Sequence, residues 1–165
     1  MRILLALLIA SLIAGCGFKL RESVTLPYSS LYVALPDYAE FGADLKRAIR
    51  ATGSTQLAAT AAAAQAVLNP AGESREKTIL SLNSAGRVRE FQLRYRYAYR
   101  VQDPQGHDLI DPVTIVLTRD FTFDDAAILA KEQEENLLWR DMQNDLVQQI
   151  MRRLASSRPK FVAGS

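Results

Sequence analysis

The chain has 165 residues, of which 48% are apolar and 23% charged, which suits one globular domain plus a targeting segment and leaves too little chain for a second independent core. The formal charge is +2, from 20 Lys and Arg against 18 Asp and Glu, and becomes about +1 without Arg2, so net charge favours no class of partner. The single cysteine excludes an internal disulfide and a cysteine-based zinc site, and the single histidine argues against a histidine metal site or a catalytic triad.

The N-terminus has the pattern of a bacterial lipoprotein signal peptide. An apolar run over residues 3–13, interrupted only by Ser11, ends in Ala14-Gly15-Cys16, and its eleven residues fall well short of the roughly 20 that span a bilayer as a helix. The pattern predicts a signal peptide over 1–15, with N-acyl and S-diacylglycerol chains on Cys16 as a membrane anchor. Because Gly17 follows the cysteine in place of Asp, we expect the periplasmic face of the outer membrane.

After the anchor, the sequence predicts an extended tether over 16–28, an α+β domain over 29–157 and a flexible tail over 158–165. The short apolar run at 31–35, which ends at Pro36, is typical of a strand. Residues 38–52 form an amphipathic helical pattern that Gly53 ends.

The Ala-rich segment 58–66 predicts a short helix, because alanine has the highest helix propensity, although a flexible linker and the order of this segment are left open. Residues 69–72, Asn-Pro-Ala-Gly, predict a turn before a strand over 74–83, and 84–86 predict the turn of a hairpin.

The region 88–101 has the strongest strand pattern in the chain. Aromatic and aliphatic side chains occupy one parity and arginines the other, which predicts a sheet covered on one face only. A turn at 103–106 and continued alternation over 113–123 predict a second long antiparallel strand.

The last predicted element is a helix of about 30 residues that begins at Asp124 or Asp125 and reaches Leu154 or Ala155. Apolar residues repeat every four positions from Leu138 to Leu154 and give a wide stripe suited to packing on a sheet. A coiled coil is the rival interpretation, but the stripe is wider than its seam.

The polar residues do not suggest catalysis. Carboxylates such as Asp124 and Asp125 stand at a helix start, where capping accounts for them, and His107 lies in a polar turn. We therefore expect no enzyme activity, no metal and no cofactor beyond the covalent lipid, and the exported location argues against nucleic acid.

The arginines are better candidates for binding. Arg87 and Arg89 at a hairpin end, and Arg94, Arg96 and Arg100 on the open face of a strand, suit phosphates or carboxylates. The alternative is a solvated face on which acidic residues of neighbouring strands neutralise the arginines.

Three segments resemble the LPS-assembly lipoprotein family LptE, also called rare lipoprotein B. They are Cys16-Gly17-Phe18-Lys19-Leu20-Arg21, the hairpin from Gly86 to Leu93, and the block from Thr118 to Asp124 that leads into Ala130-Lys131-Glu132-Gln133-Glu134. The resemblance covers nearly the whole chain, and the Ala-rich segment is its weakest part.

The resemblance implies a four-stranded, mostly antiparallel sheet with two helices packed on one face. It also implies a plug that sits one-to-one inside the outer-membrane barrel LptD, helps it assemble and binds lipopolysaccharide. The family's glycolipid-binding lysine matches Lys131. Its hairpin basic residue falls on Ser84, so Arg87 or Arg89 would have to replace it across the turn.

Two other classes of function remain open at this stage. One is an accessory lipoprotein of envelope lipid transport without a barrel partner, which would have an apolar pocket for an acyl chain. The other is a membrane-anchored hydrolase, which would need a convergent acid, base or nucleophile that the sequence does not offer.

Overall fold

The computed structural model describes residues 25–161, so the predicted signal peptide, Cys16 and most of the predicted tether lie outside the described residues. The elements are, in chain order, β1 (Ser30–Val33), α2 (Glu40–Ala51), β2 (Gln56–Leu57), η1 (Ala61–Ala63), β3 (Ala66–Leu82), β4 (Val88–Gln102), β5 (Val113–Thr122), η2 (Asp125–Ala127) and α3 (Ile128–Ser156). Here η1 and η2 are single turns of 3-10 helix.

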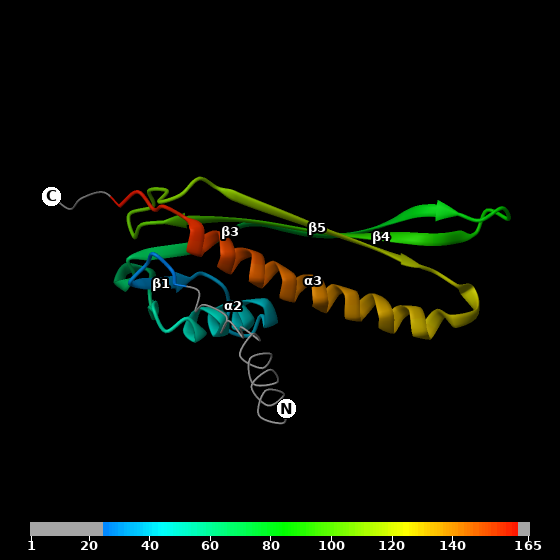
Figure 1. Cartoon of the computed structure of the whole chain (residues 1–165), viewed down its shortest axis with the longest axis horizontal. Helices are drawn as coiled ribbons and strands as arrows, with labels where there is room; N and C mark the ends of the chain where they lie inside the picture. The colour runs from blue at the N-terminus through cyan, green and yellow to red at the C-terminus, as the bar shows by residue number, and fades with distance from the viewer. Residues whose placement is uncertain (1–24, 162–165) are drawn as a thin grey trace, which may run out of the picture.

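The fold is α+β, and both long helices lie on the same face of one open sheet (Figure 1). The sheet has five strands in the order β2-β1-β3-β4-β5, in which β1 runs parallel to β2 and to β3 while the other pairs are antiparallel. The expectation of four mostly antiparallel strands was therefore wrong. At two residues, β2 is too short to show the alternation by which strands are detected in a sequence.

The molecule is built differently at its two ends. The short strand β1 pairs with β3 only over Ala66–Leu68, whereas the pairing of β3 with β4 continues from Val67 to Leu82. One end therefore has five strands covered by α2 and α3, and the other has three long strands with α3 alone (Figure 1).

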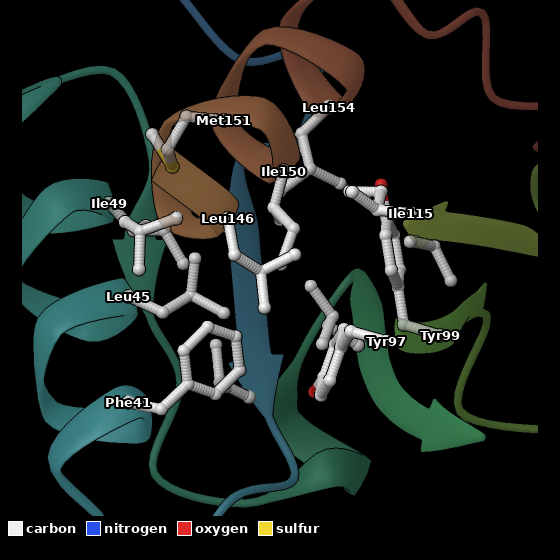
Figure 2. Close-up of a cluster of buried hydrophobic side chains, with 14 of the residues drawn as sticks. Phe41, Leu45, Ile49, Tyr97, Tyr99, Ile115, Leu146, Ile150, Met151 and Leu154 are labelled. Carbon is white, nitrogen blue, oxygen red and sulfur yellow. The ribbon is translucent and has the colours of Figure 1, made fainter. Parts of the chain in front are cut away.

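The hydrophobic core lies where both helices face the sheet. Figure 2 shows α2, α3 and the strands β4 and β5 converging on it through Phe41, Leu45, Ile49, Tyr97, Tyr99, Ile115, Leu146, Ile150, Met151 and Leu154. This arrangement confirms the predicted inward parity of β4 and the apolar stripe of the last helix. Each fully buried aliphatic side chain contributes about 1.5–3 kcal/mol relative to its exposed state.

The segment predicted to be a turn at 69–72 is part of β3. The register shifts between Pro70, which is opposite Tyr99, and Gly72, which is opposite Ala98, so a β-bulge accommodates the extra residue. Proline is tolerated because β1 has already ended beside this position, and its missing N–H breaks no pairing. The bulge also reverses parity, so that the odd-numbered residues from Glu73 to Ile79 face the helices, up to the next register shift.

The helix predicted over 58–66 is also wrong. Only η1 is helical there, and Ala66 already begins β3. Ala66 and Leu68 have no exposed surface and lie in the strand that pairs with both β1 and β4. This central pairing outweighs the modest intrinsic preference of alanine for helix.

The two long helices lie close to their predicted bounds. Asp124 caps η2 through a hydrogen bond that its side chain accepts from the Ala126 amide, and α3 follows to Ser156. Beyond α3, the Lys160 amide donates to the Leu109 carbonyl, and the Phe161 ring meets the buried Tyr28 edge to face. Across residues 25–161, no helix is both long and apolar enough to cross a membrane.

Candidate functional site

The turn between β3 and β4 is held rigidly by Asn83. Its side-chain oxygen accepts hydrogen bonds from the amides of Ala85 and Arg87, both at 3.0 Å, while its own backbone amide donates to the Arg87 carbonyl. Gly86 adopts a φ of 76°, a conformation that glycine reaches without steric cost. Ser84 lies exposed in the same turn as Arg87.

The predicted basic residues come together at this end of the molecule. Arg89 lies where β4 begins and β5 ends, because its carbonyl accepts a hydrogen bond from the Phe123 amide at 2.8 Å. Arg87 is mostly exposed and lies 3.8 Å from the Asp125 carboxylate at the start of the helical segment. Three separate elements thus present Arg87, Arg89 and Lys131 at the end farthest from the five-stranded part (Figure 1).

Lys131 is held in place rather than extended into solvent. Its ammonium donates to Thr122 Oγ1 at 3.1 Å, on the last residue of β5, and to Glu134 Oε2 at 2.8 Å, one turn along α3. Only 18% of its side chain is exposed. An anion that bound Lys131 would add to this network or displace Glu134 from it.

Aliphatic side chains are exposed at the same end. β3 contributes residues that are 48% to 57% exposed, and the first turn of α3 contributes residues that are 48% and 76% exposed. They are Ile79, Leu80, Leu82, Ile128 and Leu129. Together with Arg87, Arg89 and Lys131 they form what we call the hairpin-end surface. Exposed clusters of large apolar residues typically mark a binding surface.

A cation that the sequence analysis did not identify, Lys77, lies on the helix-facing side of β3 near this surface. Its ammonium is 2.6 Å from Glu135 Oε2 and 4.3 Å above the centre of the Phe91 ring, which itself stacks on Phe121. The bulge in β3 places Lys77 on the helix-facing side, and the sequence pattern gave no signal for that shift of parity.

The arginine-rich face of the sheet is only partly neutralised. Arg100 forms an ion pair with Asp108 at 2.7 Å, as the solvated alternative predicts. Arg94 lies opposite Glu76 and Arg96 opposite Ser74, yet neither arginine has an ion-pair partner within residues 25–161. A positive strip therefore runs along the uncovered face of β4.

The single histidine, His107, has a structural partner in its own turn. Asp103 accepts hydrogen bonds from the Gln105 and His107 amides, and its other oxygen lies 2.9 Å from the His107 ring, so both residues complete the turn. In the described part of the chain, no three histidine, cysteine or acidic side chains gather as a metal site would require.

Comparison with known proteins gives a consistent result over most of the chain. A family model described as LptE, lipopolysaccharide-assembly, matches residues 28–154. The LPS-assembly lipoprotein LptE of Yersinia enterocolitica is 29% identical over 158 residues, which are 93% of this chain and 75% of that protein.

Solved structures agree with the fold. The solution NMR structure of lipoprotein B from Nitrosomonas europaea has a TM-score of 0.71 at 41% identity, over 85% of this chain and 91% of that one. The crystal structure of a minor lipoprotein from Acinetobacter baumannii has a TM-score of 0.67 at 27% identity, over 84% of this chain and 99% of that one.

Proposed function

The chain belongs to the LptE family of lipopolysaccharide-assembly lipoproteins, and from that membership we propose that it plugs the LptD β-barrel, helps this barrel assemble and binds lipopolysaccharide on its way to the outer leaflet. The observation that carries the binding part is the hairpin-end surface, where cations and exposed aliphatic side chains share one end of the molecule. The family role is one of assembly, and we propose no catalytic step.

The hairpin-end surface suits an amphipathic anion. Arginine and lysine form charge-assisted hydrogen bonds with phosphate, and the aliphatic residues beside them offer apolar area to acyl chains. Arg87 and Lys131 each have a carboxylate neighbour, Asp125 and Glu134, so the site is preorganised but only partly neutralised. A neutral lipid would form no ion pair with either cation.

The uncovered sheet face suits the wall of a polar barrel lumen. Arg94 and Arg96 point away from the helix-covered side, and among the described residues they have no ion-pair partner. The interior of a large outer-membrane barrel is polar, so its acidic and hydroxyl groups would satisfy these arginines. We propose that this face contacts the barrel in a one-to-one complex.

Cys16 is the proposed anchor that holds the protein at the periplasmic side of the outer membrane. The nine residues from Cys16 to Val24 precede the described part and span at most about 30 Å when extended. Changing Cys16 to Ala should abolish incorporation of labelled palmitate and release the protein from membranes. Palmitate incorporation that persists in this variant would refute the anchor.

The glycolipid contact is tested by Lys131→Glu. This change replaces a phosphate ligand by a second acid beside Glu134 and should weaken binding of purified lipopolysaccharide by about tenfold or more, with unchanged circular dichroism. Arg152→Glu is the matched control, because it reverses an exposed charge on the same helix near its other end. Equal affinity of the two variants would remove Lys131 from the site.

A further inference from the structure

A polar groove of about 600 Å³ is lined by residues of α2, β3 and α3, and its α3 lining begins at Gln133, two residues beyond Lys131. It exists because α2 is the shorter helix: its 12 residues extend about 18 Å, whereas the 29 residues of α3 extend about 44 Å over a longer hairpin. Past Glu40, at the start of α2, the helix-facing side of β3 is left open next to α3.

The floor of the groove is a fixed guanidinium. Arg75 Nη2 donates to the Tyr95 hydroxyl at 3.1 Å and to Gln143 Oε1 at 3.2 Å, and Nε lies 3.4 Å from the Glu73 carboxylate. The guanidinium also stacks 4.5 Å from the centre of the Tyr95 ring. Within residues 25–161, Nη1 of Arg75 has no hydrogen-bond partner, so part of the guanidinium fork remains for a ligand.

The wall of the groove is a polar stripe on α3. Gln133, Asn136, Arg140 and Gln143 follow one another at intervals of three or four residues and therefore share one face of the helix. The exposed Arg140 has no ion-pair or hydrogen-bond partner in the described part of the chain. Trp139, half-buried beside them, adds an aromatic surface and donates to Glu135 at 3.4 Å.

This combination selects a class of ligand. Guanidinium groups bind carboxylates and phosphates in bidentate geometry, and side-chain amides both donate to and accept from hydroxyl groups. The indole offers an apolar plane to the C–H face of a sugar ring. A wholly apolar ligand is disfavoured, since it would strip water from two guanidiniums, three amides and the Glu40 carboxylate without replacing their hydrogen bonds.

We propose that this groove binds an acidic saccharide, a short chain of sugar rings that carries a carboxylate or phosphate. Its volume lies within the range of about 300–1,000 Å³ that is typical of small-molecule sites. The inference goes beyond the proposed function, because it requires neither the barrel nor the acyl chains that the hairpin-end surface would bind. The same chemistry occurs in the saccharide part of a glycolipid and in a free acidic oligosaccharide.

The chain provides its own probe for the test. Trp139 is the only tryptophan and lines the groove, so its emission reports binding there directly. We would titrate the full chain, purified in mild detergent, with digalacturonate, with neutral lactose, and with the delipidated saccharide of lipopolysaccharide. The proposal expects saturable emission changes with an acidic ligand and at least tenfold weaker binding of lactose.

Variants test whether a change in Trp139 emission comes from ligand bound in the groove. Arg140→Gln should weaken acidic-saccharide binding by about tenfold, while Arg152→Gln, which removes another exposed arginine of the same helix, should leave it unchanged. Binding of the delipidated saccharide alone would identify the glycolipid as the source, and binding of digalacturonate would identify a broader specificity. Equal binding of lactose, equal loss in Arg152→Gln, or no emission change with either acidic ligand would overturn the proposal.

Discussion

Arg75 on β3 lies directly opposite Tyr95 on β4, with its guanidinium 4.5 Å from the centre of the tyrosine ring and Nη2 3.1 Å from the tyrosine hydroxyl. That hydroxyl in turn donates to Glu73 at 2.9 Å. Burial raises the pKa of Tyr95 to about 12, although the hydrogen bond from Arg75 opposes the shift. The pair marks the boundary between the hydrophobic core and the polar groove.

Three neighbouring tyrosines of β4 differ in how their hydroxyls are satisfied. The Tyr95 hydroxyl has two partners, whereas the Tyr97 and Tyr99 hydroxyls are buried without any partner among residues 25–161. Tyr95→Phe should therefore lower the free energy of unfolding by about 1–2 kcal/mol, and Tyr97→Phe should leave it unchanged or raise it by up to about 1 kcal/mol. Urea unfolding of both variants measures this, and a larger loss in Tyr97→Phe would contradict the hydrogen-bond assignment.

The same tyrosines predict a loss of stability in alkali. Burial raises the pKa of Tyr95 and Tyr99 to about 12 and that of Tyr97 further, against about 10 in an unfolded chain. The folded state then binds more protons than the unfolded state, so stability that is complete below pH of about 10 falls as the pH rises toward 12. Urea midpoints at rising pH measure this loss, which Tyr97→Phe should reduce. A midpoint that stays constant up to pH of about 11.5 would contradict it.

Gly86 should matter more for the stability of the fold than Gly72, because only Gly86 has a positive φ. Gly86 has a positive φ of 76°, so Gly86→Ala should cost about 1–2 kcal/mol of unfolding free energy even though an added Cβ meets nothing within 4 Å. Gly72→Ala is the matched change in the bulge, where the space is equally open and φ is not positive, and it should cost much less. Urea unfolding compares the two, and equal costs would mean that backbone conformation does not fix this turn.

The spacing of apolar residues in the sequence predicted the helices and strands that bury only one face. The alternation of Leu93, Tyr95 and Tyr97 identified β4 because only one face of that strand meets the helices, and the four-residue spacing up to Leu154 identified α3 for the same reason. Glycine is common in turns, and Gly86 and Gly106 indicated both connections in the sequence. In the structure both have the positive φ that favours glycine.

Long-range pairing explains what the sequence did not reveal. Asn69-Pro70-Ala71-Gly72 has the composition of a turn, but pairing with β4 keeps it extended, with a bulge. That bulge places Arg75 and Lys77 on the helix-facing side, so the groove and the cation near the hairpin-end surface were both missed. By contrast, the position of Arg87 and Arg89 at a hairpin end was predicted, because the neighbouring residues 84–86 indicate the turn.

We propose that this lipoprotein works inside an outer-membrane barrel. The most direct test is to extract the tagged chain from outer membranes in mild detergent and identify by mass spectrometry the proteins that co-purify with it in stoichiometric amount. We expect a single large β-barrel protein in a one-to-one ratio, and crosslinkers placed at positions 94 and 96 should join the two proteins. Recovery of the lipoprotein alone, or together with an inner-membrane transporter, would contradict the barrel complex and favour a lipid-transport accessory role.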